Sequence, residues 1–422
     1  MKTTAIILFL ATYASLLIFP KVRAYIAIAS AAIFVLVGIL PIGSVFFAVD
    51  WNVILMIAGS MGVVSLFIGS HMPELLADRI IDKMPNVKWA IISLALFAGI
   101  ISSVVDNVAT VLMVAPVALT IARKLNISPI PGVIAIAVSS NLQGAATLVG
   151  DTTAILLGGY ANLDFSDFFF YQGKMGMFFV VQLGALVSTF VLLIIFRKEN
   201  SPINPVKDAL VKDYFPSYLL VGMVALLVIA SFIPEKPVIT NGLICIGLFL
   251  VGILRLILLN KDTGSAIKAF QEIDIFTILL LAGLFVVIAG ITEVGLVDDI
   301  SKLFVSLSND NLFVIFTLLV WASVVFSAFI DNIPYVATML PVVTGIATIM
   351  QIDPTILYFG LLSGATLGGN LTPIGASANI AALGVLRKEG HQPTTWQFMK
   401  IGVPFTLSAV LVGYLAIWFI WS

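Results

Sequence analysis

The sequence predicts an all-α protein that crosses a membrane many times and consists of two inverted repeats. Three observations support this fold class. Hydrophobic residues make up 60% of the chain and charged residues only 10%, whereas a soluble domain carries about 25% charged residues. Two polar pairs, Asp106-Asn107 and Asp331-Asn332, interrupt long apolar stretches. The stretches around the two pairs agree at a shift of 225 residues, and duplicated polar sites in apolar chains are typical of secondary transporters.

The first repeat is expected to cover residues 1–198. Its apolar runs predict spanning helices at about 4–20, 24–41 and 51–70. Asp50 precedes the third helix and suits an N-cap, because its side chain can accept bonds from the free N–H groups of the first turn. Residues 71–88 are amphipathic with both signs of charge, which indicates a helix along the membrane surface.

The apolar stretch 89–122 is 34 residues long, whereas one span needs about 20. Its midpoint is polar, so we predict a re-entrant hairpin with Asp106-Asn107 at a tip near the middle of the membrane. Non-helical backbone is tolerated at that depth where it lines a cavity or is buried in protein. Serine, asparagine, glycine and aspartate interrupt residues 130–158, which predicts a helix broken around 141–151. A plain span follows at 174–196.

A polar linker at 199–215 is expected to lie in the cytoplasm, and the inverted second repeat to cover 216–422. The predicted elements are spans at about 216–234, 238–259 and 275–292, a surface segment at 294–310, a hairpin at 312–349, a broken helix at 355–384 and a last span at 398–421. The agreement extends beyond the hairpins, since Gly59 aligns with Gly283 at a shift of 224. In all, we expect about 10 spanning helices and two hairpins.

The basic residues predict the orientation. Five crossings in each half turn the second half over relative to the first. This topology places 17 of the 21 Lys and Arg residues on one side and four on the other. The side rich in basic residues is expected to be cytoplasmic. The protein should then lie in the plasma membrane with both termini outside.

The two hairpin tips and the two helix breaks should meet near the middle of the membrane. Their carboxylates, amides and hydroxyls are hard oxygen ligands, suited to Na⁺ or to hydrogen bonds with a small solute. The candidate binding residues are Asp106, Asn107, Asn141, Thr147, Asp151, Thr152, Asp331, Asn332, Asn370, Thr372, Ser377 and Asn379. The four tip residues Asp106, Asn107, Asp331 and Asn332 are the candidates for Na⁺.

Glycines cluster with these polar residues at the breaks. They are Gly144, Gly150, Gly368, Gly369 and Gly375. Glycine permits unusual backbone angles and the close approach of a ligand. The alternative is tight helix packing through small residues, which is common in membranes.

The aspartates allow more than one role. Asp106 and Asp331 could cap the second arm of each hairpin, which is compatible with ion binding. Asp151 aligns with Ala376, so this acid occurs in only one repeat and is a candidate proton carrier. Since Lys and Arg fall only near the ends of the predicted spans, we expect an acidic or neutral site. Such a site disfavours a bulky polyanion unless Na⁺ binds first.

Four segments carry a resemblance to a known family. They read "SSVVDNVATVLMVAP", "NLQGAATLVGDTTAILL", "SAFIDNIPYVATMLP" and "GGNLTPIGASANI". The chain resembles the ion transporter superfamily, and within it the ArsB/NhaD group of arsenite pumps and sodium/proton antiporters, with related citrate-transporter-like permeases. The resemblance implies a homodimer, and a scaffold domain past which a transport domain slides as an elevator.

The chain departs from this family pattern at two places. The sodium-dicarboxylate branch carries Ser-Asn-Thr at each hairpin tip, and here Asp106-Asn107-Val108 and Asp331-Asn332-Ile333 stand there, which disfavours dicarboxylates. Many relatives also carry Gly-Asp-Pro-Pro-Asn in the first break, where this chain has Gly150-Asp151-Thr152-Thr153-Ala154. A ligand asparagine is therefore absent from that half.

These observations predict a secondary transporter that works by alternating access and is coupled to H⁺ or Na⁺. The expected cargo is a small inorganic ion, through Na⁺/H⁺ exchange or arsenite export. The alternative is Na⁺-coupled uptake of a di- or tricarboxylate such as citrate. Beyond the coupling ion we expect no cofactor, and we expect no nucleic-acid partner. An intramembrane aspartate protease is another class, but it would not need an inverted duplication.

Overall fold

The computed structural model describes residues 1–125, 127–202, 210–211 and 213–422. Helices form nearly all of its regular structure, and the one strand pair in these ranges joins β1 (Phe170–Tyr171) to β2 (Lys174–Met175). Seven of the described helices are long and apolar enough to cross a membrane, or up to nine if each of two sharply bent helix pairs forms one span. The predicted all-α, multi-pass fold class is confirmed.

The first half contains the predicted helices, hairpin and broken helix in the predicted order. They are α1 (Lys2–Ile18), α2 (Arg23–Leu36), α4 (Trp51–Gly69), α5 (Met72–Ile81), the hairpin of α6 (Val87–Ser102) and α7 (Asn107–Leu125), the broken helix of α8 (Ile130–Gly144) and α9 (Thr152–Ala161), and α10 (Met177–Ile195). The short helix α3 (Val45–Ala48) was not predicted, because one turn leaves no periodic signal. Residues 203–209 and 212 of the predicted linker lie outside the described ranges.

The second half follows the same order. Its helices are α11 (Phe215–Ser231), α12 (Thr240–Leu258), α13 (Thr263–Gln271), α14 (Ile275–Glu293), α15 (Leu296–Ser308), the hairpin of α16 (Leu312–Ser327) and α17 (Asn332–Met350), the broken helix of α18 (Thr355–Gly368) and α19 (Ser377–Lys388), and α20 (Thr395–Trp421). The sequence analysis missed α13, which is short and polar on one face.

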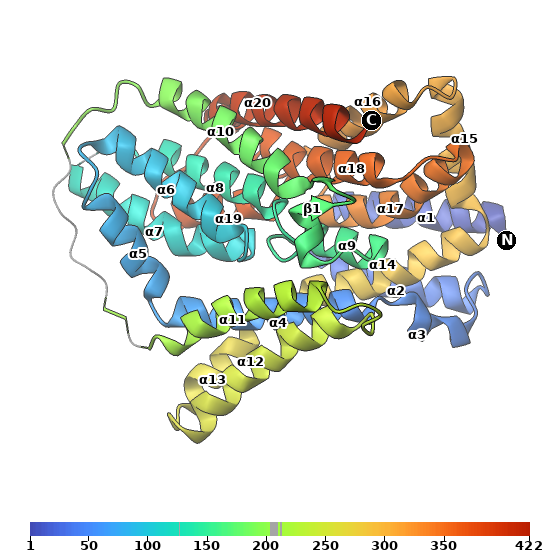
Figure 1. Ribbon diagram of the computed structural model, residues 1–422, viewed down its shortest axis with the longest axis horizontal. Helices are drawn as coiled ribbons and strands as arrows, with labels where there is room; N and C mark the ends of the chain where they lie inside the picture. The colour runs from blue at the N-terminus through green and yellow to red at the C-terminus, as the bar shows by residue number, and fades with distance from the viewer. Residues whose placement is uncertain (126, 203–209, 212) are drawn as a thin grey trace.

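The two hairpins lie at opposite ends of the molecule in Figure 1, and the broken helices connect the ends. Helix α6 packs along α8, and α16 packs along α18. Beyond its break, however, each broken helix reaches the other hairpin, so that α9 contacts α17 and α19 contacts α7. This crossing brings both hairpin tips and both breaks to the centre of the molecule.

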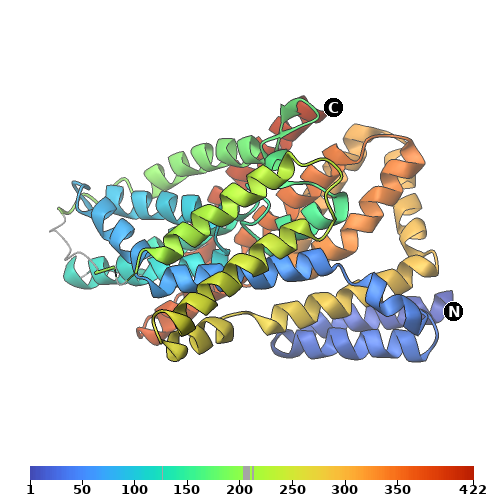
Figure 2. The ribbon, with the colours of Figure 1, turned by 60° about the horizontal axis from the view of Figure 1, so that its bottom comes forward.

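A second group of helices flanks this centre. In this group, helices from one half of the chain pack against helices from the other half. Helix α4 packs against α12, and α14 packs against α2. Figure 2 shows α11 and α12 lying along α4, and α1 and α2 lying along α14.

Two glycines make these contacts close. A Cβ on Gly59 would lie 2.3 Å from the carbonyl carbon of Cys245, and a Cβ on Gly283 would lie 2.6 Å from that of Ala27. The helices therefore touch backbone to backbone, as in other membrane helix pairs with small residues at the contact. For these two positions, the packing role of glycine is the one that the structure supports.

Asp50 and Asp274 are the N-caps of α4 and α14. The N–H of Val53 donates to Asp50 Oδ1 at 3.0 Å, and the N–H of Thr277 donates to Asp274 Oδ1 at 3.0 Å. The capping role predicted for Asp50 is confirmed.

The outward side chains are those of a protein surrounded by lipid. Along α10, Leu183, Leu186, Phe190 and Ile194 are exposed. A helix that exposes apolar residues beside its buried face fits a bilayer, because lipid tails solvate such side chains and water does not.

Candidate functional site

Asp106 and Asp331 cap the second arm of their hairpins. The N–H groups of Val108 and Ala109 donate to Asp106 Oδ1 at 3.0 and 3.1 Å. The N–H of Ile333 donates to Asp331 Oδ1 at 3.1 Å. The capping role is therefore real, and it occupies one carboxylate oxygen of each aspartate. The second oxygen decides what else each tip can bind.

Each helix break is tied to its own hairpin tip by a threonine. Thr147 Oγ1 donates to the carbonyl of Ser103, and Thr372 Oγ1 donates to the carbonyl of Ala328. The two bonds are equivalent at the shift of 225 residues. Both hydroxyl protons are used to hold the backbone, so a ligand would meet only the oxygens of these threonines.

Glycine is required where the breaks pass the tips. A Cβ on Gly150 would lie 2.6 Å from the Gly144 carbonyl oxygen and 2.9 Å from that of Ser103. A Cβ on Gly375 would lie 2.6 Å from the carbonyl oxygens of Gly369 and Ser327. These glycines allow two backbones to touch, which is the packing alternative of the sequence analysis.

The remaining glycines of the set also pack closely. A Cβ on Gly368 would meet the backbone of Val324 at 2.6 Å, and one on Gly144 would meet Asp151 Cβ at 2.8 Å.

Asparagine amides join the two halves at the centre. Asn107 Nδ2 donates to Asn141 Oδ1 at 2.9 Å, and Asn141 Nδ2 donates to the carbonyl of Thr366 at 2.7 Å and to Asn370 Oδ1 at 3.1 Å. Asn370 Nδ2 donates in turn to the carbonyl of Val138 at 2.9 Å. Buried amides with satisfied donors rigidify the structure around them. Asn141 and Asn370 therefore connect the two broken helices.

Asn379 braces the second break. Its Nδ2 donates to the carbonyls of Gly369 at 3.1 Å and Thr372 at 3.2 Å. Its Oδ1 is buried and has no hydrogen-bond partner among the described residues.

Asp151 joins the first break to the second hairpin. Its Oδ1 accepts from the N–H of Thr152 at 2.8 Å, which caps α9. Its Oδ2 accepts from Thr153 Oγ1 at 2.8 Å and from Asn332 Nδ2 at 3.4 Å. A change in the charge of this carboxylate would act on both the helix cap and the contact with the hairpin tip.

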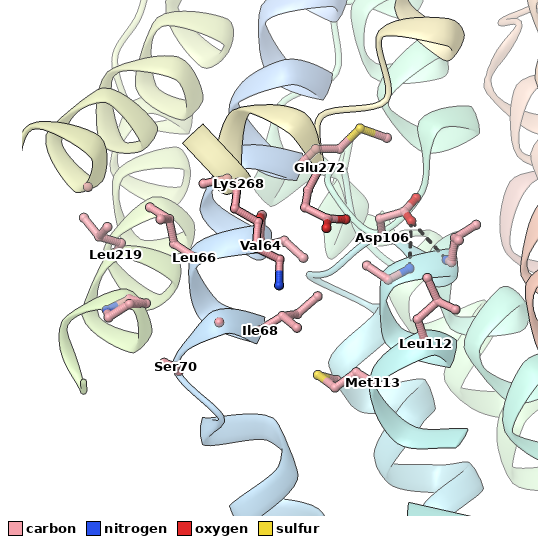
Figure 3. A pocket seen from close by; sticks show the side chains of 18 of the residues that line it. Val64, Leu66, Ile68, Ser70, Asp106, Leu112, Met113, Leu219, Lys268 and Glu272 are labelled. Carbon is pink, nitrogen blue, oxygen red and sulfur yellow. Dashed lines mark hydrogen bonds between the residues drawn. The ribbon is translucent and has the colours of Figure 1, made fainter. Parts of the chain in front are cut away.

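A cavity of about 720 Å³ reaches this centre. One wall comes from α7 and the hairpin tips, and the other from α4, α11, α12 and α13. Half of the candidate residues line it, namely Asp106, Asn107, Asp151, Thr152, Asn332 and Ser377. The others, Asn141, Thr147, Asp331, Asn370, Thr372 and Asn379, lie behind this lining. Figure 3 shows Asp106 with its N–H bonds, across the cavity from Lys268 and Glu272.

The lining of the cavity is strongly acidic. Among the described residues, two basic side chains line it, Arg255 and Lys268. Seven acidic side chains of the same described ranges line it, namely Glu74, Asp106, Asp151, Asp213, Asp262, Glu272 and Asp274. A cavity with an excess of one charge concentrates ions of the opposite sign, so this one favours cations. Glu272 was missed in the sequence, because it lies in a short polar segment between predicted spans.

An ion pair forms part of the cavity lining. Arg255 pairs with Asp213, with a second contact of 3.3 Å between Arg255 Nη2 and Asp213 Oδ1. Partial burial would raise the pKa of the Asp213 carboxyl, but the hydrogen bonds from Arg255 and from the N–H of Phe215 outweigh it. The pKa of Asp213 therefore lies below its usual value.

The cavity lining is acidic, as expected, but a basic side chain also reaches the second tip. Arg23 is the first residue of α2, one position before the predicted span, and pairs with Asp331. The two residues are 308 positions apart. The helices α1 and α2 bend by 109° at their connection, and this bend brings Arg23 to the hairpin tip. Only a contact between distant segments could reveal this pair.

A second cavity of about 620 Å³ lies near the other end of α4. Asn52 and Met56 of α4 line it, together with Gly159, Lys236 and Asn241.

A family model described as a citrate transporter matches residues 13–364. An uncharacterized transporter of Mycobacterium bovis is 31% identical over 432 residues, which cover 99% of this chain and 98% of that protein. The P protein of Homo sapiens is 25% identical over 444 residues, covering 86% of this chain and 53% of that protein. The crystal structure of the YdaH transporter of Alcanivorax borkumensis aligns with a TM-score of 0.61 at 15% identity, over 89% of this chain and 86% of that chain.

Proposed function

Because the chain belongs to the citrate transporter family, we propose that this secondary transporter exchanges Na⁺ for H⁺ and binds Na⁺ at the Asp106 tip. The observation that carries the proposal is the acidic cavity that reaches Asp106. Na⁺ prefers oxygen ligands. The tip offers the Oδ2 of Asp106, to which no described residue donates a hydrogen bond, and the side-chain oxygen of Asn107.

Charge favours a cation as cargo. Of the described residues, seven carboxylates and two basic groups line the cavity. Their field attracts Na⁺ or Li⁺ but does nothing for a neutral oxyacid such as arsenite. Na⁺/H⁺ exchange therefore fits the lining better than arsenite export, which is the other inorganic cargo that the sequence allows.

Asp151 is the proposed proton carrier. As a carboxylate it accepts bonds from Thr152, Thr153 and Asn332. Protonation would weaken these bonds, and with them the cap of α9 and the contact with the second hairpin. Asp106 and Asp151 line the same cavity, so Na⁺ at one disfavours a proton at the other, as exchange requires.

Carboxylate uptake is the second candidate, and the description of the family model favours it. A di- or tricarboxylate would enter a cavity lined mostly by carboxylates. Coulomb repulsion would oppose this entry, so a cation would have to bind first or accompany the anion.

The test uses the full-length protein in liposomes that contain a pH-sensitive dye. We expect Na⁺ or Li⁺ to trigger proton movement, and arsenite, succinate and citrate alone to trigger none. Asp106→Asn should abolish the response. Asp50→Asn is the matched control, because it removes a capping carboxylate outside the cavity, and it should retain the response.

Three other results would replace this proposal. A response to arsenite alone would indicate an efflux pump. A response to citrate or succinate only in the presence of Na⁺ would indicate carboxylate symport. An unchanged Na⁺ response in Asp106→Asn would move the cation site elsewhere.

The wider architecture remains part of the proposal. We expect a homodimer in the plasma membrane with both termini outside and no enzymatic activity. We expect the helices around the hairpins to slide as a unit past the group of α1, α2, α4, α11, α12 and α14. Backbone-to-backbone packing within that group, at Gly59 and Gly283, suits a rigid scaffold.

A further inference from the structure

A cation of the protein already occupies the Asp331 tip. Arg23 pairs with Asp331 Oδ2, and the exposed fractions of the two side chains are only 16% and 13%. Ser377 Oγ donates to the same oxygen at 3.2 Å, and the N–H of Ile333 donates to Oδ1 at 3.1 Å. Both oxygens of this carboxylate therefore have partners, and its charge is neutralised in place.

No basic side chain in the described part of the chain pairs with the equivalent Asp106. Its Oδ1 accepts two N–H bonds, whereas no hydrogen bond or ion pair from the described residues reaches its Oδ2. Asp106 also lines the large cavity, and Asp331 does not. Both tips thus have a carboxylate whose Oδ1 caps the following helix, but the charge of each carboxylate has different partners.

This difference between the tips arises from different residues at equivalent positions of α2 and α12. Gly59 meets the backbone at Cys245 and Ile246, and Gly283 meets it at Ala27 and Ile28. These matched contacts align Ala27 with Cys245, a shift of 218 residues. The same shift aligns Arg23 with Asn241.

Asn241 cannot replace the arginine. Its amide is neutral, its Nδ2 contacts Asp164 Oδ1 at 3.3 Å, and it lines the second cavity. The position equivalent to Arg23 therefore supplies no charge to the Asp106 tip.

We propose that the two hairpin tips are equivalent cation sites and that Arg23 is the resident cation of the Asp331 tip. The protein therefore binds one mobile cation per chain, at the Asp106 tip. This inference rests on the proposed function in treating the Asp106 tip as a cation site. Its physical basis is that a guanidinium and a metal ion at one buried carboxylate repel each other strongly in a medium of low dielectric constant. Loss of Arg23 should therefore open a second site.

The test is equilibrium binding of radioactive Na⁺ to the purified full-length protein. We expect one Na⁺ per wild-type chain and two per Arg23→Gln chain. The second Na⁺ should disappear again in the double variant Arg23→Gln with Asp331→Asn. Arg23→Lys, which keeps the charge, and Lys21→Gln, which removes an exposed charge two residues away, should each bind one.

Each outcome decides the question. One Na⁺ in both the wild type and Arg23→Gln would overturn the inference and leave the proposed function intact. No Na⁺ in the wild type but one in Arg23→Gln, lost with Asp331→Asn, would support Arg23 as the resident cation at Asp331 but overturn the mobile cation site at Asp106. No Na⁺ in either would overturn both.

Arg23→Gln leaves Asp331 buried without its partner. A second measurement therefore tests the inference in case this variant folds poorly. The double variant Arg23→Gln with Asp331→Asn replaces the ion pair by two neutral amides. If Arg23 is the resident cation, the double variant binds one Na⁺ with an affinity within about threefold of wild type, a change of about 0.7 kcal/mol. Loss of that Na⁺ would show that Asp331 belongs to the mobile site, contrary to the inference.

Discussion

Asp106 and Asp331 occupy equivalent hairpin tips and differ in the group that reaches their second carboxylate oxygen. Capping by backbone N–H groups is common to both. The cavity reaches Asp106, and Arg23 reaches Asp331. A duplicated motif in the sequence therefore describes a shared capping role, and the chemistry of each copy depends on its neighbours.

The role of Asp151 makes a prediction about pH. Asp151→Asn should flatten the pH dependence of transport and lower its maximum rate at least tenfold, because the amide carries no exchangeable charge. Flux measured between pH 5.5 and 8.5 in liposomes tests this. Asp50→Asn removes a cap of the same kind from α4, and it should keep the wild-type profile. If the flux of Asp151→Asn depends on pH as the wild-type flux does, this residue is excluded as the proton carrier.

The Asp213–Arg255 pair predicts a pH-dependent stability. The pKa of Asp213 is lowered in the folded protein, so its contribution is complete above the unfolded pKa of about 4 and is lost as the pH falls through the lower folded pKa. At pH 7, Asp213→Asn should reduce the free energy of unfolding by about 1 kcal/mol.

Thermal unfolding in detergent at pH 7, 5 and 3 measures this difference. The melting temperatures of wild type and Asp213→Asn should converge at the lowest pH. Arg255→Gln, which removes the partner, should behave in the same way. A gap that stays constant across the three values would show that the ion pair is not its cause.

At the scale of elements, the sequence predicted most of the helices, hairpins and breaks. It did not predict which helices pack against each other. Polar interruptions at fixed positions in apolar runs predicted both hairpins and both broken helices, because the interruption is a local property. The exchange of partners, with α4 on α12 and α2 on α14, depends on surfaces far apart in the chain. The short helices α3 and α13 were missed, since α3 is a single turn and α13 has no continuous apolar run.

The close helix contacts predict the cost of small substitutions. Gly59→Ala and Gly283→Ala should each destabilise the protein by about 1–3 kcal/mol, because the added Cβ would overlap the facing backbone. Gly247→Ala in α12 is the control, because nothing lies within 4 Å of its added Cβ. Thermal unfolding of the three variants should separate the first two from the third. Equal melting temperatures for all three would contradict this packing of α4 and α14.

At the scale of the whole molecule, the predicted topology and the cavity make a joint prediction. Asp213, Arg255 and Lys268 line the cavity and fall on the predicted cytoplasmic side. In Leu112→Cys, the new thiol lies in the cavity wall, where Leu112 is half-exposed. An impermeant maleimide should label it from the cytoplasmic side and at least fivefold less from the outside.

The native Cys245 should not be labelled by the maleimide, because its side chain is fully buried. Phe170→Cys places a thiol at an exposed position of β1, on the predicted outer side, and should label from outside. The reverse pattern for the two variants would invert the orientation derived from the basic residues.

The sequence by itself determined the fold class, the order of the elements and the twelve candidate polar residues. It could do so because apolar length, polar interruption and self-similarity are visible along a single chain. Only the tertiary structure decided which six of those residues face the cavity, and that Arg23 neutralises Asp331. Those outcomes depend on contacts between segments as far as 308 positions apart, and no local pattern records such a contact.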